Sequence, residues 1–373
     1  MIRYKKTKKC KLMNILHLEA SKGFGGQERR IVSESIGMIK RNHKVVIAAS
    51  FNAKIINEAK KNNILTYEVN FNKKSWFISF FRLIKIIKKN NINIINTHSS
   101  LDSWLGGIVA KFLKIQVIRT RHVTISIKKG INSKILYGFL ADYVITTSKE
   151  IVSIIAKQAN KNINLIKSIP TGLDLENINC TKDEEKSFKK KYNFEKNDFL
   201  IGTLCIIRNW KGIDDLLNAA KLLKNYENIK VLVIGDGYKD KFIERKEKEK
   251  INNVIFIGHL ENPYPAIRAL DVFTLLSTAN EGISQASLQA AYFKKPLITT
   301  PTGGLKEICL ENVTGFQVPI FSKEKIKEAI LKLYNNRELI NVLGTNAKEL
   351  ALKHSKENML DKIEEIYNFL KNI

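Results

Sequence analysis

The sequence 272-VFTLLSTANEGISQASLQAA-291 joins an apolar run, a glycine-containing turn and a helical pattern. A run as short as Val272–Leu275 is typical of a buried strand. The helix that follows begins with backbone N–H groups that carry partial positive charge. Gly282 lets a ligand come close to the backbone, and the carboxylate of Glu281 can accept hydrogen bonds from ligand hydroxyls. The segment predicts one strand–turn–helix unit with a ligand site at its turn, although an ordinary helix cap with a solvated Glu281 has the same pattern.

The same alternation of apolar runs and helical patterns continues in both directions along the chain. In the first half we expect strands at Asn14–Leu18, Val45–Ala49, Ile92–Thr97, Val117–Thr120 and Val144–Thr147. In the second half we expect them at Leu200–Leu204, Val231–Ile234, Val254–Ile257, Val272–Leu275 and Leu297–Thr300. Alternation of this kind is typical of parallel sheets covered by helices on both faces. Two such series predict an α/β chain with two doubly wound domains, at residues 1–175 and 176–355, and a last helix in 356–373 that returns to the first domain.

Charge is distributed unevenly over the 373 residues. Residues 1–180 contain 32 Lys and Arg against 10 Asp and Glu, a net of +22, which leaves +5 of the total of +27 for residues 181–373. A basic first half favours an anionic partner, such as nucleic acid, an acidic glycan or a membrane surface, but a lysine-rich solvated surface remains an alternative.

The cysteines and the apolar content narrow the class of protein. Cys10, Cys180, Cys205 and Cys309 are scattered, without zinc-type spacing, which favours inert thiols in a reducing compartment. The basic segment Arg3–Lys9 leads into a strand pattern, and no window has the roughly 18 apolar residues of a membrane span. We therefore expect a cytoplasmic protein without a zinc site built from clustered cysteines.

Further candidate site residues follow other predicted strands. Arg208 and Lys211 come after Leu200–Leu204, where two cations can neutralise a diphosphate, although a solvated basic turn is an equal alternative. Gly25 and Gly26 come after the first strand and open a helix, as a phosphate-binding turn or a plain tight turn would.

The first half also places a histidine and a basic cluster at strand ends. His98 directly follows Ile92–Thr97, where an imidazole can hydrogen-bond a ligand or simply cap a helix. Arg119, Arg121 and His122 follow the next strand and could meet an acidic acceptor. No segment matches the glycine patterns of P-loop or classical dinucleotide-binding proteins.

Taken together, these motifs resemble those of the family 4 retaining glycosyltransferases, in the same order. The motifs are Gly25-Gly26-Gln27-Glu28, His98, Arg208 with Lys211-Gly212, Gly235-Asp236-Gly237, Glu281-Gly282 and Pro301-Thr302-Gly303-Gly304. Pro170–Asp174 resembles that family's linker, so the likeness runs from about Asn14 to Lys371. It implies the GT-B architecture, two Rossmann-like domains facing across a cleft, with a nucleotide-sugar donor held mainly by the second domain, no bound metal and retention of anomeric configuration.

The resemblance also implies roles for individual residues. His98 and Glu281 are the catalytic candidates. The diphosphate candidates are Arg208, Lys211, Gly25 and Gly26, and those for the donor sugar and nucleotide are Gly282, Ile283, Ser284, Gln285 and Gln289. Gln289 departs from the family pattern, which has a second glutamate there, but an amide can still hydrogen-bond a ribose diol.

The basic residues near His98 resemble those of family members that build lipopolysaccharide and other envelope glycans. This likeness implies a lipid-linked saccharide acceptor at the cytoplasmic face of the inner membrane, with Arg119, Arg121 and His122 on the acceptor side. Aromatic and basic residues alternate over Trp76–Lys89, which fits either a helix packed on the sheet or peripheral contact with an anionic membrane. A GT-B epimerase or hydrolase is the nearest alternative function, and a basic nucleic-acid-binding protein is a distant one because no nucleic-acid module is recognisable.

Overall fold

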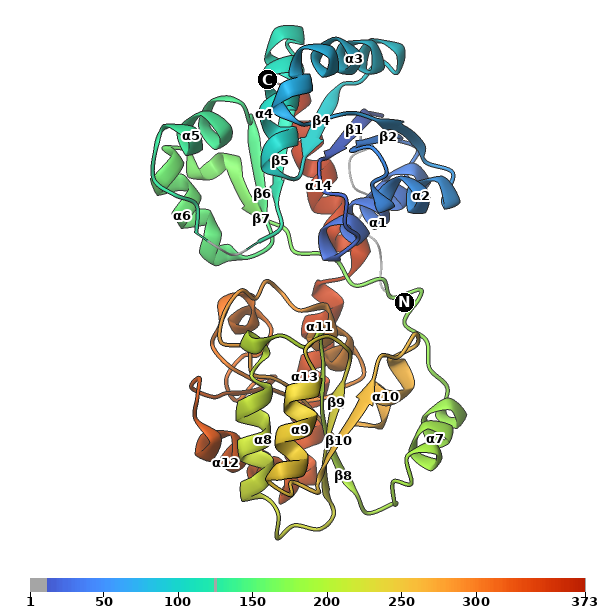
Figure 1. Ribbon diagram of the computed structural model, residues 1–373, viewed down its shortest axis with the longest axis vertical. Coiled ribbons are helices and arrows are strands. Elements are labelled where there is room, and N and C mark those ends of the chain that lie inside the picture. The colour runs from blue at the N-terminus through green and yellow to red at the C-terminus, as the bar shows by residue number, and fades with distance from the viewer. Residues whose placement is uncertain (1–11, 124–125, 373) are drawn as a thin grey trace. The chain divides into compact units, whose positions relative to one another are not determined.

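The computed structural model describes residues 12–123 and 126–372, and they form two compact units (Figure 1). The first unit comprises Met1–Thr171 with Lys356–Ile373, and the second comprises Gly172–Ser355. The basic segment Arg3–Lys9 and Cys10 lie outside the described residues.

The first unit is built on a seven-stranded, fully parallel sheet in its described part. Its strands, in the order β3-β2-β1-β4-β5-β6-β7, are β3 (Leu65–Glu68), β2 (Lys44–Ala49), β1 (Asn14–Glu19), β4 (Ile94–Thr97), β5 (Gln116–Arg121), β6 (Tyr143–Thr146) and β7 (Ile166–Ser168). Its helices are α1 (Gly26–Lys40), α2 (Lys54–Lys61), α3 (Trp76–Lys89), α4 (Ser100–Leu113), α5 (Ile131–Ser133), α6 (Lys149–Ala159) and α14 (Lys356–Lys371). Short helical turns occur at Lys73–Ser75, Lys134–Phe139 and Ile163–Leu165.

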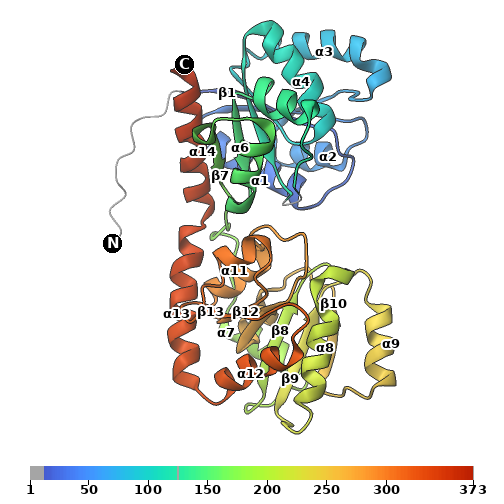
Figure 2. The same ribbon diagram turned by 90° about the vertical axis from the view of Figure 1, so that its left-hand side faces the viewer.

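Helices cover both faces of this sheet because successive residues of each strand point to opposite sides. Ile15 and Ile94 pack with Leu360 and Ile363 of α14, whereas Leu16 packs on the opposite face with residues of α3 and α4. Figure 2 shows α14 beside α1 and the sheet. The end of the chain therefore contributes to the core of the first unit.

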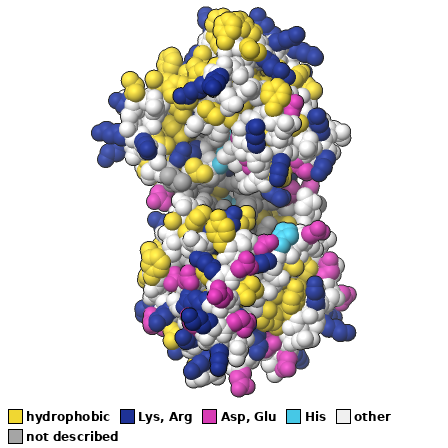
Figure 3. All heavy atoms as spheres, viewed as in Figure 1, with side chains coloured by type: hydrophobic (Ala, Val, Ile, Leu, Met, Phe, Trp, Pro, Cys, Tyr) yellow, Lys and Arg dark blue, Asp and Glu magenta, His cyan; other side chains and the backbone are white. Residues whose placement is uncertain are grey.

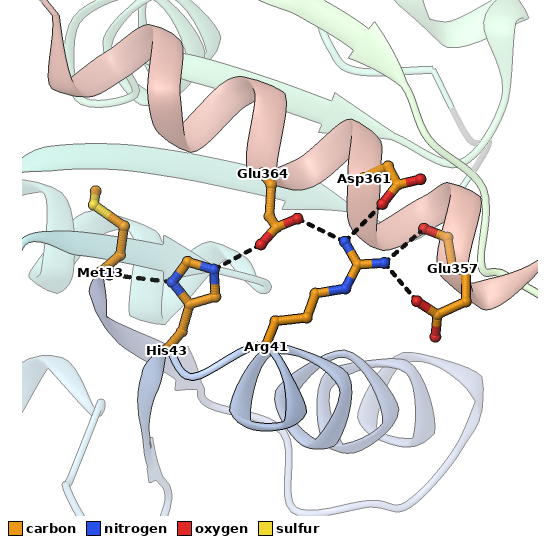
Figure 4. Close-up of polar contacts among 6 residues, drawn as sticks. All are labelled: Met13, Arg41, His43, Glu357, Asp361 and Glu364. Atoms are coloured by element: carbon orange, nitrogen blue, oxygen red, sulfur yellow. Dashed lines mark hydrogen bonds and ion pairs between the residues drawn. The ribbon is translucent and has the colours of Figure 1, made fainter. Parts of the chain in front are cut away.

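Polar contacts also hold α14 against the end of α1 (Figure 4). The guanidinium of Arg41 reaches Asp361 at 2.7 Å, Glu364 at 2.6 Å and Glu357 at 2.5 Å. His43 lies 2.9 Å from the second oxygen of Glu364 and accepts a hydrogen bond from the backbone of Met13. This network, the Arg41 cluster, joins residues more than 300 positions apart in the sequence.

The second unit contains a six-stranded, fully parallel sheet within the described residues. The strand order is β10 (Val254–Gly258), β9 (Ile229–Ile234), β8 (Phe199–Leu204), β11 (Val272–Leu275), β12 (Leu297–Thr299) and β13 (Gly315–Gln317). Its helices are α7 (Lys182–Lys191), α8 (Ile213–Leu222), α9 (Asp240–Lys248), α10 (Tyr264–Ala269), α11 (Gln285–Tyr292), α12 (Lys323–Tyr334) and α13 (Arg337–Lys353), with short turns at Asn209–Lys211 and Gly303–Glu307.

The prediction of two parallel, doubly wound α/β domains is confirmed, and each of the ten predicted strands is present within a few residues. Three strands were not predicted: β3, β7 and β13. All three are short and lie at an edge of a sheet, where one side of the strand has no neighbour. Their apolar patterns are correspondingly weak.

The strand order reverses direction between β1 and β4 in the first unit and between β8 and β11 in the second. At such a switch point, the loops that follow the two strands leave toward opposite faces and create a crevice where ligands bind. Gly25 and His98 follow the two switch strands of the first unit, and Lys211 and Glu281 follow those of the second. Topology thus brings together motifs that are distant in sequence.

Candidate functional site

In the second unit, Lys211 and Glu281 form a close ion pair at the switch point. The side chain of Glu281 is almost fully buried and also accepts a 2.8 Å hydrogen bond from the hydroxyl of Ser277. Lys211 retains 18% exposure. The pair offers a carboxylate and an ammonium group side by side, the two chemistries needed to bind a sugar hydroxyl and a phosphate oxygen.

Backbone contacts hold the two loops together. The N–H of Thr278 donates to the carbonyl of Trp210 at 2.8 Å, which joins the loop after β11 to the loop after β8. Gly212 has φ +68°, and a Cβ there would lie 2.0 Å from the carbonyl oxygen of Leu276. Only glycine fits so close an approach, so Gly212 is needed to set the position of Lys211.

A third loop packs behind Glu281. Gly303 has φ +54°, and its Cβ position lies 1.9 Å from the carbonyl oxygen of Glu281. The N–H of Gly304 donates to the same carbonyl at 3.0 Å. The Pro301–Gly304 motif therefore supports the backbone of Glu281 directly.

Arg208 is held by a contact in its own loop and by a contact with the loop that follows β9. Its guanidinium lies over the ring of Tyr238, 4.6 Å from the ring centre, and donates to the carbonyl of Ile207 at 3.1 Å. The side chain remains half-buried. It supplies a second, oriented cation on the loop that carries Lys211.

The residues after Glu281 form the start of α11. Ser284 is the N-cap, and its hydroxyl accepts a 3.2 Å hydrogen bond from the N–H of Ser287. Ile283 is buried in the core, so its side chain is unsuited to contact a ligand and its contribution is its backbone. Gly282, Gln285 and Gln289 are half-buried, and Gln289 lies one turn into the helix. The segment combines a capped helix N-terminus with polar side chains.

In the first unit, His98 is the middle member of a chain of three histidines. Its Nε2 lies 2.9 Å from Nδ1 of His17, and its Nδ1 lies 2.9 Å from Nε2 of His122. The rings of His17 and His98 are stacked with their centres 5.2 Å apart. His98 is therefore buried with both ring nitrogens engaged, and a ligand can reach Nδ1 only if His122 moves aside.

Burial keeps this histidine chain neutral. Desolvation, together with the charge of Arg30, lowers the pKa of His17 to about 3. Burial and then the neighbouring His122 hold the pKa of His98 well below 6.5, and burial does the same for the pKa of His122. Each ring consequently has one N–H donor and one lone pair.

We infer the direction of the hydrogen bonds among the three histidines from His17, at one end of the row. We assign a proton to Nε2 of His17, which lies 4.0 Å from the carboxyl of Glu34, beyond hydrogen-bond distance. Nδ1 of His17 then accepts from Nε2–H of His98. This leaves Nδ1 of His98 as an acceptor, directed toward His122.

Two buried carboxyl groups organise the same strand ends. Asp102 accepts hydrogen bonds from the backbone N–H groups of Ala20, His98 and Ser99, and so joins the end of β1 to the end of β4. Glu19 accepts from the N–H of Ser21 at 2.7 Å and from the amide of Gln27 at 2.5 Å. Burial raises the pKa of Asp102 to about 6 and, with the charge of Asp102, raises that of Glu19 to about 8.

Sequence reasoning missed His17, Glu19 and Asp102. The Ser99-x-x-Asp102 spacing is a capping-box signal that could have identified Asp102. Glu19 could also have been identified, because it is a carboxylate at the end of an otherwise apolar strand. Nothing in the sequence marks His17, because its partner lies 81 residues away.

Gly25 and Gly26 are exposed at the start of α1. A Cβ at Gly26 would meet no atom within 4 Å, so space is open in front of this backbone. The N–H of Gly25 already donates to the carboxylate of Glu28 at 2.7 Å. Of the two glycines, Gly26 is therefore the better placed to receive a ligand.

The expected acceptor-side cluster divides into two kinds of residue. Arg119 is buried, lies over the ring of Tyr137, and donates to the carbonyl of Ser99 and to the hydroxyl of Ser103. The expectation that it faces an acceptor is thus corrected: it supports the loop that carries His98. Arg121 and His122 are half-buried, with Arg121 donating to the hydroxyl of Tyr137 at 2.8 Å.

Over residues 12–123 and 126–372, His, Cys, Asp and Glu side chains nowhere gather in a group of three suited to a metal ion. Within those same ranges, no helix has the length and apolar character required to cross a bilayer. The described cysteines, Cys180, Cys205 and Cys309, are free thiols.

Two family models match successive parts of the chain. Residues 24–177 match Glycosyltransferase Family 4, and residues 184–350 match Glycosyl transferases group 1. The chain belongs to the group 1, family 4 glycosyltransferases. It is therefore a transferase enzyme, and the resemblance inferred from the spaced motifs is confirmed.

Relatives and solved structures agree with this assignment. The glycosyltransferase is 28% identical to the Staphylococcus aureus capsular polysaccharide biosynthesis glycosyltransferase CapM over 79% of this chain and 81% of the relative. It is 24% identical, over 96% of this chain and 100% of the relative, to a Campylobacter jejuni α-1,4-N-acetyl-D-galactosaminyltransferase named for an undecaprenol-diphosphate-linked acceptor. The crystal structure of Anabaena HepE in complex with UDP covers 97% of this chain and 100% of that chain, with a TM-score of 0.85 at 17% identity, which shows the shared GT-B fold.

Proposed function

We propose that this glycosyltransferase moves a sugar, with retention of configuration, from a nucleoside-diphosphate donor to a lipid-linked saccharide at the cytoplasmic face of the membrane. The product would belong to a cell-envelope glycan of the lipopolysaccharide or capsule type. The Lys211–Glu281 pair at the switch point of the second unit carries this proposal.

The chemistry of the second unit suits a sugar diphosphate. Lys211 and Arg208 are oriented cations that neutralise the diphosphate, and their effect is largest when the leaving group gains charge. Glu281 accepts hydrogen bonds from sugar hydroxyls, beside the N-terminus of α11. When the sugar–phosphate bond breaks, the acceptor oxygen bonds the same carbon from the same face, the acceptor proton passes to the departing phosphate oxygen, and the nucleoside diphosphate leaves. The cations supply the stabilisation in this scheme, and no metal is required.

Relatives support the choice of donor and acceptor. The Anabaena structure contains UDP, and the Campylobacter relative is named for an undecaprenol-diphosphate-linked saccharide. The first unit adds the histidine chain and the half-buried Arg121 and His122 for the acceptor side. Peripheral contact with an anionic membrane would bring the enzyme to such an acceptor.

The proposal is tested first by ligand-induced stabilisation. A thermal-shift panel of UDP-, GDP- and ADP-sugars should identify one nucleotide that raises the unfolding temperature, because a ligand stabilises the state that binds it. The Lys211→Gln variant serves as the matched control and should lose most of the shift. A panel without any shift in the wild-type protein would contradict the assignment of the donor.

The second test follows the product. The stabilising donor is incubated with a polyprenyl-diphosphate-linked saccharide, and the new linkage is examined by NMR. We expect the anomeric configuration of the donor to be retained in the glycosylated lipid. An inverted linkage, or release of free sugar only, would contradict the proposal.

A further inference from the structure

Helix α3 exposes large apolar side chains that the core of the first unit does not use. Phe77, Ile78 and Phe81 are 77%, 73% and 54% exposed, and Phe112 at the end of α4 is 68% exposed. Phe80 connects them, with its ring centre 5.5 Å from that of Phe81 and 5.6 Å from that of Phe112. We call Phe77, Ile78, Phe81 and Phe112 the aromatic surface. Figure 3 shows hydrophobic side chains gathered at this end of the first unit.

The side chains that pack α3 into the core of the first unit are different from those of the aromatic surface. The helix buries Leu83, Ile86 and Ile87 in the core, together with Ser79, whose hydroxyl donates to the carbonyl of Asn70. The aromatic surface lies on a different arc of the helix and adds apolar area in contact with water. Contiguous exposed apolar patches are uncommon on monomeric proteins unless they bind something.

A basic pocket adjoins the aromatic surface. It is a cavity of about 310 Å³ lined by Tyr67, Arg82, Lys85, Ile86 and Lys89. Arg82 follows Ile78 by four positions, and Lys85 follows Phe81 by four, so cations and apolar side chains are neighbours along the helix. The phenol of Tyr67 and three cationic groups provide hydrogen-bond donors suited to a phosphate.

Helix α3, which supplies most of the pocket lining, contains no acidic residue. Between Glu68 and Asp102 there is no Asp or Glu, while Lys73, Lys74, Arg82, Lys85, Lys88 and Lys89 fall in that interval. The nearest carboxylate in sequence, Glu68, accepts a hydrogen bond from the N–H of Asn52. A run of positive charge without a carboxylate thus lies beside the exposed apolar side chains of α3.

From this juxtaposition we propose that the aromatic surface and the basic pocket together dock the enzyme on an anionic phospholipid bilayer. A lipid headgroup phosphate occupies the basic pocket, and Phe77, Ile78, Phe81 and Phe112 enter the boundary between headgroups and acyl chains. Helices with a charged arc beside an apolar one lie in this way in the plane of the interface. The assignment rests on the proposed function, because docking brings the enzyme to the lipid-linked acceptor proposed above.

Co-sedimentation with vesicles tests the assignment independently of catalysis. The full-length protein is mixed at 0.1 M salt with vesicles of phosphatidylcholine alone or with about a third phosphatidylglycerol. The charge variant is Arg82→Gln/Lys85→Gln/Lys89→Gln, and the apolar variant is Phe77→Ser/Phe81→Ser/Phe112→Ser. A matched control, Lys182→Gln/Lys190→Gln/Lys191→Gln, removes the same charge from exposed positions of α7 in the second unit.

We expect the wild-type protein to bind anionic vesicles at least tenfold more tightly than neutral ones. The charge variant should lose at least tenfold in partitioning to anionic vesicles, because each cation near the leaflet contributes about 1 kcal/mol, and the control should lose less than twofold. The apolar variant should lose binding to a similar extent. All three variants should keep the wild-type unfolding temperature within about 2 °C, since they change exposed side chains.

Two outcomes would overturn the assignment. Equal binding to neutral and anionic vesicles would show that the enzyme does not select an anionic bilayer. Equal losses in the charge variant and its control would show that only net charge matters. Hydrolysis of the free nucleotide-sugar donor is measured in parallel and should be unchanged in every variant. Vesicle binding without any donor turnover would instead count against the proposed function and leave the docking surface intact.

Discussion

Replacing His17 with phenylalanine tests whether the histidine chain sets the protonation of His98. His17 is fully buried and supplies the acceptor that lies 2.9 Å from Nε2 of His98. Phenylalanine keeps a stacked ring but leaves that buried N–H without a partner, which costs about 1–3 kcal/mol of folding free energy. Thermal unfolding followed by circular dichroism should detect this loss.

The effect on turnover separates orientation from simple packing. Without His17, either nitrogen of His98 can hold the proton, so the acceptor at Nδ1 is no longer favoured. If the tautomer with the proton on Nε2 of His98 loses about 1.4 kcal/mol of its advantage, kcat should fall about tenfold. We expect KM for the donor to change less than about threefold, because the donor-binding candidates Lys211 and Glu281 belong to the other unit.

The conservative variant His17→Gln is the control. Its amide oxygen can accept the hydrogen bond from His98, so it should recover much of kcat while remaining less stable than the wild-type protein. Steady-state transfer is measured at a temperature where both variants are fully folded. A phenylalanine variant with wild-type kcat would refute the reasoning, as would equal losses of kcat in both variants.

Four further predictions concern pH, the donor site and the Arg41 cluster. Burial lowers the pKa of His17 to about 3, so between pH 6.5 and pH 3 the unfolded chain takes up a proton at this residue and the folded protein does not. The stabilisation from neutral His17 is therefore complete above pH 6.5 and is lost as the pH falls, and by pH 5 the loss of unfolding free energy is about 2 kcal/mol. The raised pKa values of Glu19 and Asp102 change the stability in the opposite direction. The measurement is therefore the difference in unfolding free energy between wild type and His17→Phe, taken at pH 7 and again at pH 5. The same difference at both pH values would contradict the burial argument. Glu281→Gln should reduce transfer more than tenfold, a barrier increase of at least about 1.4 kcal/mol, and retention of wild-type kcat/KM in initial-rate assays would remove Glu281 from the sugar site. Gln289→Glu should change donor affinity by calorimetry no more than a few fold if this position meets a ribose diol, and a collapse of binding would show that the site depends on an amide. Arg41→Met should destabilise the protein by about 1–3 kcal/mol at low salt and less at 1 M salt, as partly exposed ion pairs do, and thermal scans that show equal losses at both salt concentrations would contradict an electrostatic anchor for α14.

The sequence alone determined the class of fold and the order of its motifs. Buried parallel strands are continuous apolar runs, so Val231–Ile234 or Val272–Leu275 can be recognised from neighbouring residues. The same local signals placed His98, Lys211 and Glu281 at strand ends. The edge strands β3, β7 and β13 were not predicted because each is only three or four residues long, too short for a clear apolar run.

Only the tertiary structure decided which of these side chains meet. Lys211 and Glu281 are 70 residues apart, and they form a pair because β8 and β11 flank the reversal of strand order. Arg119 was expected to meet an acidic acceptor, yet it is buried against Tyr137 and donates to the carbonyl of Ser99. A residue's type determines the bonds it can make, whereas the path of the chain determines its partners and its exposure to water. For that reason the sequence indicated the chemistry of Lys211 and Glu281, and His17 became visible only as a neighbour of His98.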